Sequence, residues 1–171
     1  MSTRYPTATL ALVVIAAALS GCAPAPEPTP TASPVFASEE EAFAAAEEVY
    51  REYNEAGNAR IAGESSPDPQ DFLIGEALEA DIDGLRLFDE QGIHLSGTAS
   101  VGEVAGISVT TATVLASVCI IATDVRVIDS AGADVTPAER PESSLLHVIF
   151  TEVDGDLFIS KSDLVEDVRG C

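Results

Sequence analysis

Two histidines and one aspartate are the side chains of this sequence best suited to proton transfer. His94 and His147 each lie in strand-like runs, and His147 with Asp124 is the sharpest acid–base combination that the chain offers. The alternative is structural: His147, between Leu146 and Val148, is a partly exposed strand residue, and Asp124 ends a strand. The sequence contains no nucleophile elbow, phosphate-binding loop, dinucleotide fingerprint or HExxH motif. We therefore expect no catalytic site, with Asp124 and His147 as weak candidates.

Calcium is the second chemistry to consider, because carboxylate oxygens are ligands that Ca²⁺ prefers. The segment Asp81-Ile-Asp83-Gly84 begins like an EF-hand loop, but its glycine comes at the fourth position, whereas that loop requires glycine at the sixth. Two aspartate pairs, Asp129 with Asp134 and Asp154 with Asp156, fall at predicted hairpin turns, where aspartate commonly serves turn geometry. We expect no metal site and no cofactor.

The N-terminus carries a targeting signal. One cation, Arg4, precedes an apolar run from Leu10 to Leu19 that is too short to span a bilayer and fits a signal-peptide core. The following Leu19-Ser20-Gly21-Cys22 resembles the lipobox of bacterial lipoproteins. The resemblance implies that residues 1–21 are removed and that the Cys22 thiol carries a diacylglycerol with palmitate-type chains. The alternative is an ordinary secretory signal in which the cysteine stands by chance.

A proline-rich tether is expected at residues 22–37. Alternating prolines favour polyproline II over helix, so the stretch from Ala23 to Pro34 spans roughly 40 Å at about 3.1 Å per residue. Two acyl chains suffice for stable anchoring, which predicts an extracytoplasmic protein at the outer face of the cell membrane. The Ala-, Val-, Glu- and Asp-rich composition, with Lys161 as the single lysine, is similar to that of actinobacterial envelope proteins.

Cys119 and Cys171 remain once Cys22 is assigned to the lipid. Outside the cytoplasm, an even number of remaining cysteines usually forms a disulfide. This one would close a loop of about 50 residues, worth about 4 kcal/mol in the chain-entropy picture. A pair of free thiols or a metal site are the alternatives, although two cysteines without a nearby histidine make a poor zinc site.

Charge and composition limit the partners. The 171 residues include 8 Lys+Arg and 29 Asp+Glu, for a net charge of −21. This excludes a nucleic-acid binder, which needs a basic face, and electrostatic adhesion to anionic lipids. The hydrophobic fraction of 46% is too high for a disordered acidic tail. Residues 38–171 are therefore expected to fold as one domain.

The first half of this domain has helical patterns. Ser38 and Glu41 form a capping box, Glu47 can pair with Arg51, and Gly57 is the expected C-cap. A second helical pattern runs over residues 70–91 and ends at Gly92; Gly75 and Gly84 weaken it, which predicts two short helices or one kinked helix. The apolar stripe of the first helix has steps of three and four: Phe43, Ala46, Tyr50 and Tyr53.

After Gly92 the period changes to two, which predicts strands. In the longest run, residues 107–122, one face is entirely apolar from Ala112 to Ile120, so Cys119 is expected on the opposite, less buried face. Turns are expected at residues 130–132 and at Asp154-Gly155. The other candidate strands are residues 93–100, 125–129, 144–153 and 157–159.

Helices followed by antiparallel strands predict an α+β fold, with the helices packed on a curved sheet of four to five strands. The order resembles the cystatin-like group, in particular the nuclear-transport-factor-like or ketosteroid-isomerase-like cone, and more narrowly small actinobacterial lipoproteins with such a domain. The residues that carry this resemblance are Tyr50, Tyr53, the strand ending Val118-Cys119, the segment 124–132, the Asp154-Gly155 hairpin and Cys171.

Three functions remain open on this basis. The preferred hypothesis is a lipid-anchored, non-catalytic binding or interaction module for a small apolar ligand or an envelope protein. The alternative is an isomerase or dehydratase that uses Asp124 or His147 as a base inside the cone. A structural spacer or an accessory to a larger complex cannot be separated from the first hypothesis by sequence, because fold analogy alone assigns no function.

Overall fold

A computed structural model describes residues 36–166 and 171 of the chain. The predicted signal peptide, the lipobox residues Leu19, Ser20, Gly21 and Cys22, and the tether as far as Val35 lie outside the described residues. The elements are, in chain order, α1 (Glu39–Ile61), the 3₁₀ turn η1 (Pro69–Phe72), α2 (Gly75–Gln91), β1 (Ile93–Ser96), β2 (Ser100–Val109), β3 (Thr113–Ile121), β4 (Arg126–Asp129), β5 (Ser143–Val153) and β6 (Asp156–Leu164).

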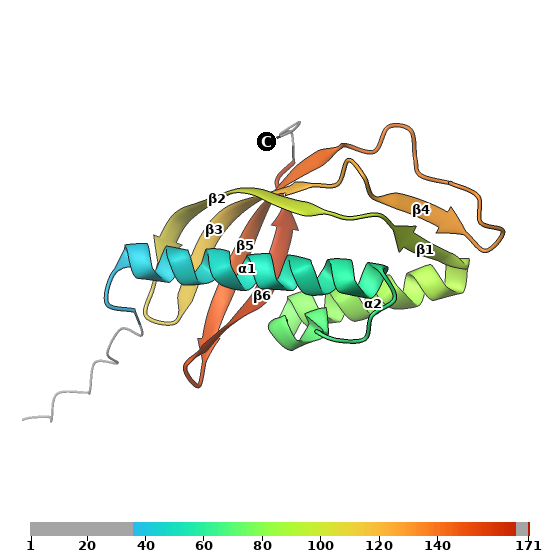
Figure 1. The fold of residues 1–171 in the computed structure, drawn as a ribbon. Helices are drawn as coiled ribbons and strands as arrows, with labels where there is room; N and C mark the ends of the chain where they lie inside the picture. Colours follow the sequence, from blue (N-terminus) through green and yellow to red (C-terminus); the bar gives the residue numbers. More distant parts are fainter. Residues whose placement is uncertain (1–35, 167–170) are drawn as a thin grey trace, which may run out of the picture. The chain divides into compact units, whose positions relative to one another are not determined.

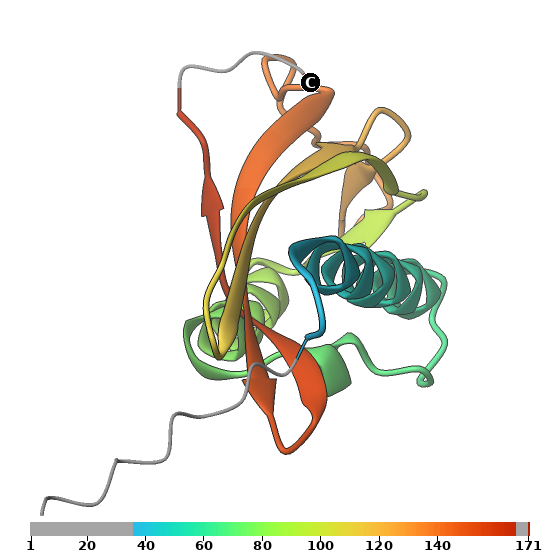
Figure 2. The ribbon, with the colours of Figure 1, turned by 90° about the vertical axis from the view of Figure 1, so that its left-hand side faces the viewer.

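The strands form two antiparallel sheets. The larger has the order β2-β3-β5-β6, and the smaller pairs β1 with β4. Both helices lie on the same side of the larger sheet (Figure 1), which curves around α1 when viewed along the helix (Figure 2). The predicted fold class, helices packed on a curved antiparallel sheet, is confirmed.

The core lies between α1 and the inner face of the sheet. Alternation along β3 points Val114, Ala116 and Val118 at the helix, and each is essentially fully buried. A Cβ atom at Gly106 on β2 would overlap the Phe43 ring, so glycine at this position lets α1 approach the sheet closely. The other buried core members are Ala42, Ala46, Tyr50, Leu73, Val148, Phe150 and Ile159.

The predicted local signals hold at several element ends. The Ser38 hydroxyl accepts a hydrogen bond from the Glu41 backbone, and Gly92 ends α2 in the left-handed conformation with φ 63°. Asp154 and Gly155 both have positive φ, 56° and 98°, in the turn between β5 and β6. These positions depend on backbone rules that act over a few residues.

The first helix is longer than predicted, and Gly57 is not its C-cap. It continues to Ile61 because its last turns bind distant chain segments: the Asn58 side-chain amide exchanges two hydrogen bonds with the backbone of Ala99, at 2.8 and 2.9 Å. The 70–91 pattern divides into η1 and one helix that runs through Gly84.

The strand predicted within the 107–122 run is β3, and the start of that run belongs to β2. Strand β2, absent from the prediction except at its two ends, stops at Val109, and β3 begins at Thr113. The Thr110 hydroxyl holds the turn between them by accepting hydrogen bonds from the backbone of Ala112 and Thr113. The apolar positions shift across this turn, from Ile107 and Val109 at odd numbers to Ala112 and Val114 at even numbers, so a break in the alternation marks it. None of the described helices is long and apolar enough to cross a membrane.

Candidate functional site

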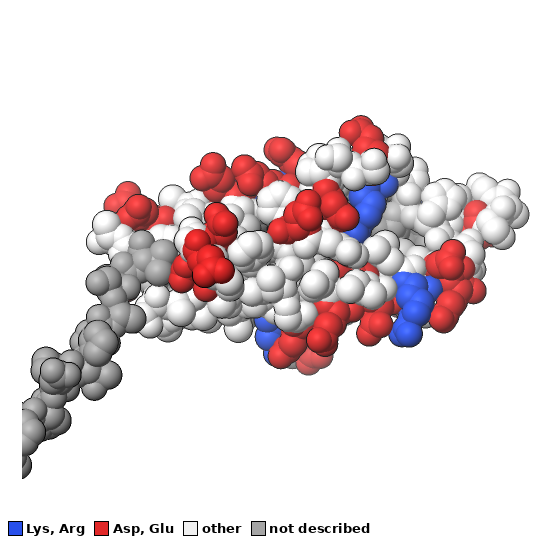
Figure 3. Space-filling view, turned by 90° about the horizontal axis from the view of Figure 1, so that it is seen from below, with Lys and Arg blue, Asp and Glu red and all other residues white. Residues whose placement is uncertain are grey.

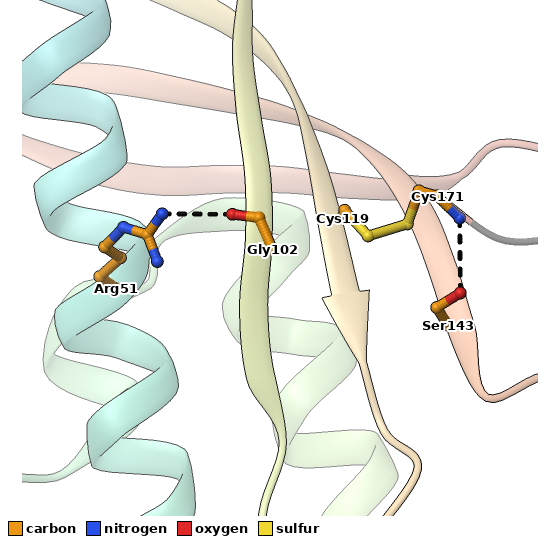
Figure 4. Close-up of a disulfide and its surroundings, with 5 residues drawn as sticks. All are labelled: Arg51, Gly102, Cys119, Ser143 and Cys171. Carbon is orange, nitrogen blue, oxygen red and sulfur yellow. Dashed lines mark hydrogen bonds between the residues drawn. A yellow bond between two sulfur atoms is a disulfide. The ribbon is translucent and has the colours of Figure 1, made fainter.

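Cys119 and Cys171 form a disulfide, as predicted, with their Cα atoms 5.7 Å apart (Figure 4). Cys119 lies on the face of β3 that points away from α1, yet it is only 2% exposed. The neighbouring strand contributes Gly102, where a Cβ atom would come within 3.2 Å of the Cys119 sulfur, so glycine leaves room for the bridge. Beside it, the backbone N–H of Cys171 donates to the Ser143 hydroxyl at 3.4 Å. The bridge joins the last residue to a central strand.

Asp124 and His147 are both exposed, and neither lines a hollow described below. On β5, His147 lies opposite Ser117 and Asp163, between the inward-facing Leu146 and Val148. Alternation along the strand therefore places it on the outer face of the sheet. His147 is the exposed strand residue of the structural alternative, whereas Asp124 lies in the loop between β3 and β4 rather than at the end of a strand. Neither exposed side chain supports a base inside the cone.

Two of the aspartates considered for calcium, Asp129 and Asp134, hold turns. The Asp129 carboxylate accepts from the backbone of Ala131 and Ala133, and Asp134 accepts from the backbone of Thr136, as expected for turn residues. Asp81 lies within a helix rather than a metal-binding loop. The described residues contain no group of three or more His, Cys, Asp or Glu side chains placed to hold a metal ion.

A cavity of about 400 Å³ opens between α1, α2 and the strands β5 and β6. Its apolar wall comes from all of these elements: Tyr50 and Tyr53 from α1, Ala77 from α2, and Leu146 and Ile159 from the sheet. Leu146 and Ile159 point from the inner face of their strands. The cavity therefore lies against the same apolar faces of α1 and the sheet that form the core. Leu73, Glu76, Ala80, Asp81, Lys161, Ser162 and Asp163 complete the lining.

The Asp81 carboxylate is the most strongly held polar group of this cavity. Its oxygens accept two hydrogen bonds from the Arg60 guanidinium, at 2.6 and 3.0 Å, and one from the Gln70 amide at 3.0 Å. Burial alone would raise the pKa of Asp81, but these hydrogen bonds and the charge of Arg60 outweigh it and hold the pKa below its ordinary value. Asp81 therefore stays ionised.

The other two carboxylates of the cavity share one cation. The Lys161 ammonium lies 3.2 Å from Glu76 on α2 and 3.5 Å from Asp163 on its own strand. The side-chain hydrogen bond with Glu76, followed by the charge of Asp163, raises the pKa of Lys161. All three carboxylates lining the cavity are thus paired with a cation.

Tyr50 and Tyr53 bring phenolic hydroxyls to the apolar end. Tyr50 packs edge-on against Tyr53 and Phe150, with ring centroids 5.6 and 6.4 Å apart. Burial, with the neighbouring phenol second, raises the pKa of Tyr50; burial followed by the charge of Asp81 raises that of Tyr53. Both rings stay neutral, and the phenols provide polar groups in an otherwise apolar wall.

The sequence reasoning did not bring these groups together. The sequence indicates Tyr50 and Tyr53 as part of an apolar stripe and of the family resemblance, and Asp81 only as part of a weak calcium motif. Arg60 and Lys161 had one available signal: each is a rare cation in a chain dominated by acids. Their partners are 21 and 85 positions away, beyond the reach of helical spacing.

A second hollow, about 540 Å³, lies between the C-terminal end of α1, the C-terminal half of α2, and β1. Its floor is apolar: Ile61, Leu85, Phe88, Ile93 and Leu95. Its rim carries Arg60, Asp89 and His94. Ala80 and Asp81 line both hollows, so the Arg60–Asp81 pair lies between them. We call this second hollow the α2 groove.

The helix side of the molecule is strongly acidic. Figure 3 shows Asp and Glu side chains spread over this face in several groups, with Lys and Arg confined to a few isolated spots. Several of the cations are engaged in ion pairs with carboxylates, including Arg51 with Glu47 and Arg86 with Asp83. A ligand or partner that approaches this face meets an excess of negative charge.

No protein-family description matches the chain, and no curated protein matches it in sequence. Among solved structures, it is similar to the intermembrane space region of the chloroplast protein ARC6, with 13% identity and a TM-score of 0.51, over 72% of this chain and 95% of that one. Aln2 from a Streptomyces species has 16% identity and a TM-score of 0.46, over 76% and 93% of the two chains. ActVI-ORFA from Streptomyces coelicolor has 15% identity and a TM-score of 0.45, over 75% and 98%. The likeness to the ARC6 region concerns the fold alone.

Proposed function

We propose that this protein is a lipid-anchored, extracytoplasmic binding module that holds a small, largely apolar ligand without converting it. The observation that carries the proposal is the cavity between α1, α2, β5 and β6, which has an apolar and aromatic wall beside the ion-paired side chains of Asp81 and Lys161. A volume of about 400 Å³ is within the range typical of small-molecule sites. The Tyr50 and Tyr53 hydroxyls would orient a polar end of the ligand.

The state of the cavity's titratable groups favours binding over catalysis. A general base works best when its pKa is near the working pH, but Arg60 and Gln70 lower the pKa of Asp81. The pKa values of the Tyr50 and Tyr53 phenols are raised, so these groups are poor general acids as well. Glu76 and Asp163 are each paired with Lys161. The isomerase or dehydratase alternative therefore lacks support from these side chains.

Anchoring through Cys22 rests on the lipobox and on the tether that follows it. The Cys119–Cys171 bridge is consistent with this location, because disulfides persist mainly outside the cytoplasm. In this proposal the acyl chains hold residues 38–171 at the outer face of the cell membrane.

The cavity is tested with the neutral fluorescent probe N-phenyl-1-naphthylamine, whose emission rises in an apolar site. Ser162 lines the cavity on the edge strand β6, so Ser162→Trp should block its mouth and abolish most of the fluorescence gain. The matched control is Ser108→Trp on the opposite edge strand β2, also exposed and outside the cavity. Equal probe binding by both variants would remove the basis of the proposal. As a separate test, native mass spectrometry of the chain from its natural host shows whether a small molecule is retained.

The anchor is tested by expressing full-length Cys22→Ala in an actinobacterial host. Without the thiol no thioether can form, so the variant should no longer incorporate a labelled fatty acid. Ser20→Ala is the matched control, because alanine keeps this position small and should preserve acylation. Labelled fatty acid in Cys22→Ala would contradict the assignment of Cys22.

A further inference from the structure

The C-terminal half of α2 exposes an unusual amount of apolar surface. None of the 17 residues of this helix is buried, and Ile82, Leu85 and Leu87 are 49%, 38% and 48% exposed. An ordinary surface helix turns its apolar side chains toward the core and its polar side chains to water. Here Leu85 instead lines the α2 groove, and Ile82 and Leu87 flank it on the same helix.

The α2 groove is itself apolar at its base and belongs to three separate elements. Leu85 and Phe88 face Ile61 at the end of α1, while Ile93 and Leu95 of β1 close the third side. The stretch of α2 that lines it, from Ala80 to Asp89, is about 14 Å long at about 1.5 Å per residue. A groove of this length accommodates between two and three turns of a partner helix, whose apolar side chains would fill the space between α2 and β1.

Charge at the groove selects the kind of partner. The two arginines nearby are already neutralised, Arg60 by Asp81 across the helices and Arg86 by Asp83 along α2. The exposed carboxylate of Asp89, which lines the groove, has no ion-pair partner among the described residues. Net negative charge around an apolar floor complements a segment with one apolar face and a basic rim.

The groove lies at the far end of α1 from the point where the chain enters the domain. The N-terminal segment joins α1 at Ser38, whereas Ile61 at the opposite end lines the groove. At about 1.5 Å per residue, the 23 residues of the helix separate these two points by about 34 Å. The groove and the point where the chain enters α1 therefore lie at opposite ends of the helix.

We propose that the α2 groove docks a short, basic amphipathic helix of a partner protein. Apolar residues at steps of three and four would rest on Leu85, Phe88 and Ile93, and a lysine or arginine along the edge would approach Asp89. This is the helix-in-groove mode of recognition. None of these four residues lines the ligand cavity, so the proposal does not depend on the proposed function.

The experiment uses the chain from residue 22 with Cys22→Ser and a fluorescein-labelled probe peptide, LKKLLKLLKKLLKL, whose order gives one apolar face as a helix. Fluorescence anisotropy should show binding that weakens as salt is added. Leu85→Asp should weaken it about tenfold or more, because one leucine contact is worth about 1.5 kcal/mol or more. Val135→Asp, at an equally exposed apolar residue outside the groove, should bind like the parent. Both variants add one negative charge, so a difference between them cannot come from net charge.

Three results would overturn the proposal. One is equal binding by Leu85→Asp and Val135→Asp, which would make the interaction non-specific attraction to an acidic surface. Another is equal binding of a peptide of the same composition in scrambled order. The third is a concentration-dependent dimer in sedimentation that Leu85→Asp abolishes, which would assign the groove to a second copy of this chain. Circular dichroism checks that Leu85→Asp is folded. A second pair of variants, Asp89→Lys at the groove and Glu103→Lys outside it, repeats the comparison by reversing one exposed charge in each.

Discussion

Individual residues decide where segments of this domain can meet. Gly97, between β1 and β2, has φ 91°, and a Cβ atom there would overlap the backbone carbonyl oxygen of Asp124. The contact joins the loop after β1 to the loop before β4, and only glycine satisfies both the left-handed backbone and the close approach. Gly132 has a similar φ of 82°, but nothing lies within 4 Å of its hypothetical Cβ.

This pair of glycines separates backbone strain from steric overlap. Gly132→Ala should lower the free energy of unfolding by about 1 kcal/mol, the cost of a left-handed alanine. Gly97→Ala adds the overlap with Asp124, so its loss should exceed that of Gly132→Ala by at least about 1 kcal/mol. Urea denaturation of the two variants gives both values. Equal losses would mean that the two loops separate at little cost.

At the scale of elements, α2 lies on the surface of the described fold. It buries no residue, and its apolar contacts with the core come from Ala77 and Leu78. Polar contacts therefore contribute much of its attachment: Arg60 of α1 binds Asp81, and Lys161 of β6 binds Glu76. The first of these is the better shielded, with 11% of the Asp81 side chain exposed.

We expect Asp81→Asn to lower the free energy of unfolding by roughly 1–2 kcal/mol, because the paired Arg60 loses a charged acceptor. The pKa of Asp81 is lowered in the folded state, so the carboxylate's contribution is complete above its ordinary pKa of about 3.9. It is lost as the pH falls through the lower, folded-state pKa. The difference between the urea midpoints of the parent chain and Asp81→Asn should therefore stay constant from neutral pH to about pH 4 and shrink below that.

Asp83→Asn is the matched control for this prediction. Asp83 pairs with Arg86 at 3.0 Å on the same helix, but both side chains are about two-thirds exposed. Exposed pairs contribute little, so this variant should change stability by less than about 0.5 kcal/mol at any pH. If Asp83→Asn costs as much as Asp81→Asn, the link between α1 and α2 is not what holds α2.

At the scale of the whole molecule, the disulfide closes the fold. It joins Cys119 in the second strand of the β2-β3-β5-β6 sheet to the last residue, 52 positions later. The loop it closes contains β4, β5 and β6, so it restricts about a third of the chain in the unfolded state. Nearby, Arg51 of α1 donates to the Val101 and Gly102 carbonyls at 3.2 Å, which ties the first helix to β2, the edge strand beside Cys119 (Figure 4).

Cys171→Ser should therefore lower the free energy of unfolding by about 4 kcal/mol. The comparison is with Cys119→Ser and with the double variant: all three lose the same bridge, so their urea midpoints should agree apart from the small effect of a hydroxyl at buried position 119. Reducing the parent chain should bring it to the Cys171→Ser midpoint. Additive losses in the double variant would mean that each cysteine stabilises the fold independently of the bridge.

Much of this protein is readable in its sequence because the physics involved is local. Ser38 at the helix start, Gly92 at a helix end and the Asp154-Gly155 turn each reflect backbone preferences over a few residues. The alternation of β3 likewise predicts its buried face. The Cys119–Cys171 pair follows from counting cysteines, given the resemblance that assigns Cys22 to a lipid.

Only the tertiary structure decided the position of the candidate sites. The cavity joins Tyr50, Asp81 and Lys161, which lie in three elements, and no periodicity relates positions so far apart. The same holds for Arg60 with Asp81 and for Asn58 with Ala99, whose contacts extended α1 past its predicted end. The exposure of His147 likewise required knowing which face of the sheet the helices cover. Alternation determines that neighbouring strand residues point in opposite directions, whereas the packing of distant elements determines which direction is inside.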